Sequence, residues 1–143
     1  MKKNHWLSYF LYSVILLSYI FFSNKLLLVV NEQTKNTFDY VPGLIWSTII
    51  SVVLGALLGV EKFILERRKE GHWEVNLPKA IFLGIPSLYL AFGYFLYYCP
   101  IIFVQQTLTY PVQLFLQSNP SIMSISQMIF GFVAVTSFMK VEY

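Results

Sequence analysis

The chain has 143 residues, of which 57% are hydrophobic, 18% aromatic and only 12% charged, and its formal net charge is +3. An average soluble domain is about 25% charged, and a small domain buries only a limited fraction of its surface. This composition therefore argues against a soluble domain and favours the lipid bilayer as the solvent. The single cysteine, Cys99, excludes an internal disulfide.

Charge-free runs of about 20 apolar residues predict where the chain crosses a membrane, because such a helix covers about 30 Å of hydrocarbon. The first run begins at Trp6 and predicts a tilted span over about 6–30. It follows Met-Lys-Lys, as the apolar part of a signal peptide would, but the small-residue cleavage pattern is missing from the sequence. We therefore expect an uncleaved first span.

The second apolar run predicts a span over about 40–65, which Pro42 and Gly43 open. Small residues recur at every fourth position of this span, namely Gly43, Ser47, Ser51, Gly55 and Gly59. Small side chains let two helix backbones approach closely in lipid. A four-residue period drifts by about 40° per step on an α-helix, so this small-residue stripe winds across the helix surface. We expect it to pack helices, within this chain or with a second copy or another membrane protein.

The most charged stretch of the chain follows and predicts a loop over 66–79. With four spans, one side of the membrane holds this loop and both termini, and it carries eight of the ten basic residues. An excess of Lys and Arg marks the cytoplasmic side, so both termini are predicted to be cytoplasmic. The basic residues at this loop are Lys62, Arg67, Arg68 and Lys69.

Three further roles for this loop compete with topology alone. Glu70, His72 and Glu74 are candidate metal ligands, but their spacing does not match the usual ligand sets, and we expect no metal. The basic residues could attract anionic lipid, although four interleaved glutamates weaken their field. The loop could also dock a cytoplasmic protein. Nucleic-acid binding is not expected, because it requires an unbroken basic face with stacking groups.

The next charge after Lys79 is Lys140, and the 60 residues between them are too many for one span. This run predicts two spans, at about 80–104 and 120–139. A glutamine-rich segment over 105–119 separates them and is expected to lie in the outer interface. Asn76 and Asn119 are typical helix starts, the second with Pro120 at the first helical position.

The interiors of the four predicted spans contain no ionisable Asp, Glu, His or Arg, which argues against a proton-coupled transporter and an acid–base enzyme. The third and fourth spans contain polar residues that could line a path, namely Ser87, Tyr94, Ser124 and Gln127. Gln127 is the most polar of them, and we expect it to bond Tyr94 or Ser51 inside the bundle.

These patterns predict an all-α fold, an integral membrane bundle of four transmembrane helices in one domain over 1–143. The composition is rich in Ile, Phe, Tyr, Lys and Asn and is typical of an AT-rich bacterial genome, so we expect a bacterial plasma membrane. The leading hypothesis is a non-enzymatic accessory, assembly or immunity-type subunit that binds lipid and another membrane protein or a second copy, without a cofactor. The alternative is a small oligomeric channel or transporter. An enzyme that uses Glu70, His72 and Glu74 is a third class.

Overall fold

The computed structural model describes residues 5–119 and 121–141, and this part of the chain is mostly helical, as the sequence predicts. The chain forms two compact units, Met1–Trp46 and Ser47–Tyr143, and the boundary falls inside helix α2. The prediction of a single domain over 1–143 remains a prediction. Two helices are long and apolar enough to cross a membrane, α1 (His5–Thr37) and α2 (Val41–Arg67).

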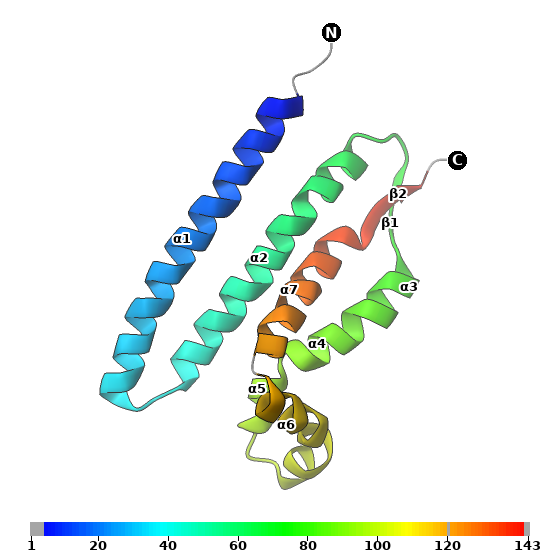
Figure 1. Ribbon diagram of the computed structural model, residues 1–143. Coiled ribbons are helices and arrows are strands. Elements are labelled where there is room, and N and C mark those ends of the chain that lie inside the picture. Colours follow the sequence, from blue (N-terminus) through cyan, green and yellow to red (C-terminus); the bar gives the residue numbers. More distant parts are fainter. Residues whose placement is uncertain (1–4, 120, 142–143) are drawn as a thin grey trace. The chain divides into compact units, whose positions relative to one another are not determined.

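The first unit contains α1, a turn over 38–40 and the first turns of α2 (Figure 1). α1 ends where Phe38 adopts a left-handed backbone conformation, with φ of 57°. Residues with a Cβ rarely adopt this conformation. α2 begins where the Asp39 side chain accepts a hydrogen bond from the Val41 N–H at 3.1 Å. Pro42 fits this first turn because the N–H that proline lacks has no helical partner there.

The second unit contains the rest of α2 and a series of shorter elements (Figure 1). These elements are β1 (His72–Val75), α3 (Leu77–Lys79), the π-helical turn η1 (Ala80–Gly84), α4 (Ile85–Ala91), α5 (Gly93–Tyr97), the π-helical turn η2 (Val104–Leu108), α6 (Thr109–Ser118), α7 (Ser121–Thr136) and β2 (Phe138–Val141). α7 packs along α4 and η1, and α6 contacts α5 and α7. The core of this unit lies around α7, where Met123 and Val133 are buried.

Two asparagines start helices at the predicted places. The Asn76 side chain accepts a hydrogen bond from the Lys79 N–H at 3.2 Å and caps α3. The Asn119 side chain accepts one from the Ser121 N–H at 3.0 Å at the start of α7. Pro120, which the sequence places at the first position of that helix, lies outside the described residues.

The predicted loop 66–79 contains a strand that the sequence analysis did not anticipate. β1 pairs with β2 in an antiparallel two-stranded ribbon, in which Trp73 lies opposite Lys140 and Val75 lies opposite Phe138. Gly71 precedes this strand with φ of 131°, a conformation that favours glycine. The ribbon therefore joins the segment between α2 and α3 to the segment that follows α7.

The predicted span 80–104 is not one continuous helix. Its helical path breaks at Phe92, where φ is −98° and ψ is 13°, and α5 ends at Tyr97. The predicted interfacial segment 105–119 is largely helical, since η2 and α6 occupy most of it. Two apolar helical stretches, Leu77–Ala91 and Ser121–Thr136, overlap parts of the predicted third and fourth spans but are shorter than α1 and α2, so the bundle of four transmembrane helices remains a prediction.

Candidate functional site

A close helix contact in the second unit is made by a reciprocal pair of glycines on α2 and α7. A Cβ added at Gly55 would collide with the carbonyl oxygen of Met128, and a Cβ added at Gly131 would collide with the carbonyl oxygen of Val52. Each glycine thus admits a backbone carbonyl of the other helix. This approach requires both glycines, because no other residue lacks a Cβ.

The small-residue stripe of α2 faces different neighbours along its length. Gly59 lies against α7, where an added Cβ would come within 3.1 Å of Thr136 and of Val135. Gly43 belongs to the first unit, and its Cβ position is 3.4 Å from Thr34 Oγ1 on α1. Ser47 and Ser51 between them are partly exposed. A stripe with a four-residue period winds around the helix, which is why its two ends meet different helices.

Gln127 is the polar centre of this contact and is only 2% exposed. Its amide nitrogen donates to Thr48 Oγ1 on α2 at 3.0 Å and to the Ala91 carbonyl oxygen on α4 at 3.1 Å. These partners differ from Tyr94 and Ser51, which the sequence analysis had expected. One side chain of α7 therefore ties together α2 and α4, the two helices that flank it.

The hydrogen bond from Gln127 gives the Ala91 carbonyl, at the break next to Phe92, a partner that the broken helix does not supply. In an unbroken helix the Ala91 carbonyl would accept from the Phe95 N–H, but that N–H bonds the Phe92 carbonyl at 3.0 Å. Gln127 supplies the missing donor, as a side chain must when a broken helix is buried away from water. The Gln127 Oε1 atom is buried and has no hydrogen-bond partner among the described residues.

The other predicted path residues do not gather around Gln127 through hydrogen bonds. Ser87 is buried and donates to carbonyls of its own helical stretch, to Leu83 at 2.6 Å and to Gly84 at 3.0 Å. Tyr94 and Ser124 are partly exposed. A serine that bonds the carbonyl one turn earlier hides its hydroxyl within its own helix.

The predicted basic loop 66–79 and β2 together close the C-terminal end of α2. The Lys140 ammonium donates to the Lys69 carbonyl at 2.7 Å and to the Arg67 carbonyl at 3.2 Å. Helix ends leave such carbonyls without partners, and a cation there also interacts favourably with the helix dipole. Lys69 pairs with Glu66 at 2.8 Å. The hydrogen bond from Lys69, with one from the Lys140 N–H, lowers the pKa of Glu66 below its usual value.

A second lysine closes the C-terminal end of α7. The Lys79 ammonium donates to the carbonyl of Thr136 at 3.2 Å and also to its hydroxyl. It lies 5.4 Å from the centre of the Phe132 ring. Two lysines that the sequence analysis counted as topology signals thus cap two helices.

Three of the basic residues that the sequence analysis assigns to the cytoplasmic side, Lys62 and Arg67 on α2 and Arg68 directly after it, are exposed. His72 and Glu74 alternate with Trp73 on β1 and share one face of the ribbon, while Glu70 precedes the strand. Within 5–119 and 121–141, the structure shows no group of three or more His, Cys, Asp or Glu that could hold a metal ion.

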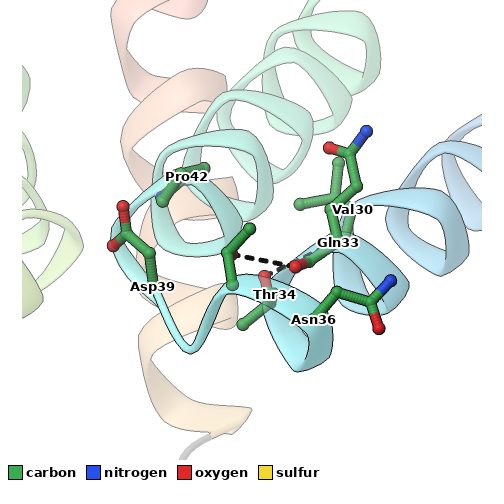
Figure 2. Close-up of a pocket in the computed structure, with 7 residues that line it drawn as sticks. Val30, Gln33, Thr34, Asn36, Asp39 and Pro42 are labelled. Carbon is green, nitrogen blue, oxygen red and sulfur yellow. Dashed lines mark hydrogen bonds between the residues drawn. The ribbon is translucent and has the colours of Figure 1, made fainter.

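A pocket of about 490 Å³, lined by both polar and apolar groups, lies in the first unit at the turn between α1 and α2. Figure 2 shows that Asp39 lies on one side of it, while the amides of Gln33 and Asn36 lie on the other side and point in different directions. The hydroxyls of Thr34 and Thr37 donate to carbonyls of α1. The polar groups therefore do not converge on one point, as they would in a site for an ion or a small ligand.

No family model matches this chain, and neither a curated protein nor a solved structure matches it. The arrangement of the residues is thus the basis for a functional proposal. It consists of a close helix contact with a buried amide, and of two lysine-capped helix ends.

Proposed function

We propose that this chain is a small multi-pass protein of a bacterial plasma membrane with four spans and cytoplasmic termini. It acts without catalytic machinery of its own, as an accessory, assembly or immunity-type subunit that packs against other membrane components. The observation that carries the proposal is α1, a helix of 33 residues and hence about 50 Å. Its large apolar side chains are exposed over most of its length, including Phe10, Leu17 and Phe21.

The glycine faces of α2 and α7 in the second unit pack against each other within the chain. Gly55 and Gly59 pack against α7, so the C-terminal part of the stripe is not available to a partner. A helix that is apolar on all sides is stable in water only if other elements cover it, and otherwise suits a membrane. These facts support α1, rather than the α2 stripe, as the surface that packs against a partner.

The short stretches Leu77–Ala91 and Ser121–Thr136 serve as the third and fourth spans in this proposal. α7 has 16 residues, so it is about 24 Å long, against about 30 Å of hydrocarbon. Short spans are accommodated by local thinning of the bilayer at a modest cost.

Four spans with cytoplasmic termini place the C-terminus in the cytoplasm. A reporter that is active only outside the cytoplasm, fused to the C-terminus, should therefore stay inactive.

The test places a photoreactive phenylalanine analogue at Phe10 or Phe21 of α1 in native cells. We expect a stoichiometric crosslink from these positions to one membrane protein or to a second copy. Phe92 is the comparison position, because it is less exposed, at 39% against 65% for Phe10 and Phe21, and should crosslink less. Its ring contacts Phe95 and Phe130 at 5.7 and 6.2 Å between ring centres. Crosslinks from α1 to lipid alone would contradict a subunit role, and recovery of the chain without detergent would contradict the membrane location.

The alternative function is a small oligomeric channel or transporter with a path along Ser87, Tyr94, Ser124 and Gln127. The observation that favours it is the unpaired Oε1 of Gln127 beside a helix break, because broken helices line the sites of many transporters. Cysteine placed at Ser124 or Ser87, in a chain whose Cys99 is replaced by serine, should then react with a water-soluble thiol reagent. Complete protection of both positions would eliminate this alternative.

A further inference from the structure

An apolar groove of about 280 Å³ runs along the second unit between two walls. Ala80, Gly84 and Leu88 form one wall, on the path from η1 to α4, and Phe130 and Ala134 of α7 form the other. Residues four apart lie one above the other on a helix, so the groove follows the helix axes. In a membrane-spanning helix this direction is close to that of the lipid acyl chains.

Small side chains keep this groove open, and its lining is almost entirely apolar. A Cβ added at Gly84 would have Val133 Cγ1 as its neighbour at an ordinary contact distance of 3.7 Å. Ser137 also lines the groove, but its hydroxyl donates to the Val133 carbonyl at 2.6 Å. The groove therefore offers contacts to a hydrocarbon chain and no free hydroxyl to a polar ligand.

The groove ends at the β ribbon, on a face that carries a cation and an indole. Val75 and Phe138 line its end and lie opposite each other in the ribbon. Trp73 and Lys140 also lie opposite each other, two residues along the ribbon from Val75 and Phe138. Side chains two apart on a strand point to the same side, so all four residues share this face. The Lys140 ammonium lies 5.4 Å from the Trp73 ring centre. Trp73 is 44% exposed, as expected for an indole at the headgroup level.

The fold also separates the charges that are interleaved in the sequence. Glu74 lies on the opposite face of the ribbon from Lys140, because it alternates with Trp73 and Val75 along β1. Glu66 is held by Lys69 at 2.8 Å and by the Lys140 N–H. Glu74 is thus turned away from Lys140, and Glu66 and Lys69 neutralise each other.

We propose that the groove and the adjoining ribbon face form a binding site for one anionic phospholipid. One acyl chain lies in the groove between Gly84 and Ala134, and the phosphate lies beside Trp73 at the Lys140 ammonium. Two N–H groups of this ammonium donate to the Arg67 and Lys69 carbonyls, and the third is left for the phosphate. An apolar trough that ends at a cation and an indole matches an amphiphile whose headgroup is negatively charged. This inference rests on the proposed membrane location and is independent of any protein partner.

The test adds dioleoyl-phosphatidylglycerol or dioleoyl-phosphatidylcholine to the detergent-solubilised chain and measures binding by native mass spectrometry. Gly84→Leu and Ala134→Leu fill the groove from its two walls, and each should weaken binding of both lipids by about ten-fold. Lys140→Gln should weaken phosphatidylglycerol binding by about five-fold, the effect of one cation near a headgroup, and should weaken phosphatidylcholine binding less, because the choline cation offsets the charge of its phosphate.

Two controls keep the outcomes separate. Ile49→Phe adds bulk at an exposed position of α2 outside the groove, and Lys35→Gln removes a charge in the first unit; both should bind lipid as the wild type does. Unchanged lipid binding by a folded Gly84→Leu variant would overturn the proposal. A wild-type dimer that this variant dissociates would also overturn it, because the groove would then hold a helix of a second copy. Recovery of the wild type from cells without detergent would instead refute the membrane location on which the site rests.

Discussion

In the unit that begins at Ser47, α2 and α7 meet at backbone distance through Gly55 and Gly131, and a buried glutamine ties both to α4. In the unit that ends at Trp46, α1 keeps most of its large apolar side chains exposed. The first arrangement is specific, since it depends on individual glycines and one amide. The second depends on composition alone and tolerates many apolar residues. The contrast distinguishes the part of the chain whose helices pack on one another from the part whose apolar surface is available to lipid or to another protein.

The largest expected effect comes from Gly55→Leu, which drives a side chain into the Met128 carbonyl. We expect a loss of about 3 kcal/mol or more of unfolding free energy, because the helices must separate. Unfolding with increasing SDS in detergent micelles measures this. Gly43→Ala is the control in the other unit, where the Cβ position has ordinary contacts at 3.4 Å or more, and should change stability by less than about 1 kcal/mol. Wild-type stability of Gly55→Leu would show that the close contact does not support the unit.

Gln127→Leu should have a smaller effect, because it removes two hydrogen bonds but also removes the unpaired Oε1. We expect a destabilisation of about 1 kcal/mol, within the range of interhelical hydrogen bonds in membranes. Gln113→Leu at an exposed position of α6 is the matched control and should be nearly neutral. A Gln127→Leu variant more stable than the wild type would mean that the amide is retained for a purpose other than stability.

Phe38→Gly tests the turn of the first unit. Phe38 holds φ of 57° and is 81% exposed, so the change removes backbone strain at the cost of few contacts. We expect a gain of about 0.5–1 kcal/mol, because glycine adopts this conformation readily. The same SDS unfolding series measures it, with Phe38→Ala as the control that keeps the strain. A loss of stability specific to glycine would show that the unfolded chain's added freedom outweighs the relieved strain.

The smallest effect is a pH dependence from Glu66. Its pKa is lower in the folded chain than in the unfolded chain, so its contribution is fully present above the unfolded pKa and is lost as the pH falls through the folded pKa. The stability difference between the wild type and Glu66→Gln should therefore shrink on acidification. A difference that stays constant between neutral pH and pH values below the folded pKa would contradict the role of this carboxylate.

The sequence predicts the helices of this fold better than it predicts their contacts. The stripe from Gly43 to Gly59 was visible as a period, and its winding was expected from helix geometry. Its partner Gly131 was not identified, because spacing on one helix carries no information about which helix it meets. The ribbon was missed since its strands have only four residues each. Gly93, directly after the break at Phe92, was an available signal for the interrupted helix.

The same limit applies to the charged residues. Lys79 and Lys140 entered the sequence analysis as topology signals, and that interpretation concerns only the side of the membrane on which they lie. Their roles as caps depend on carbonyls that are 57 and about 70 residues away along the chain. A cap of that kind becomes visible only when the fold brings a lysine from a distant part of the chain to the end of a helix.

The hydrogen bond between Thr48 and Gln127 joins residues 79 positions apart, and it has a consequence for the order of synthesis. A ribosome adds about 5–20 residues per second, so α2 emerges roughly 4–16 seconds before its partner α7. During that interval the glycine face of α2 has no α7 to pack against, although the helix itself is complete. The nascent chain therefore reaches its final packing only with its last helix, and a chain truncated before Ser121 would keep that face uncovered.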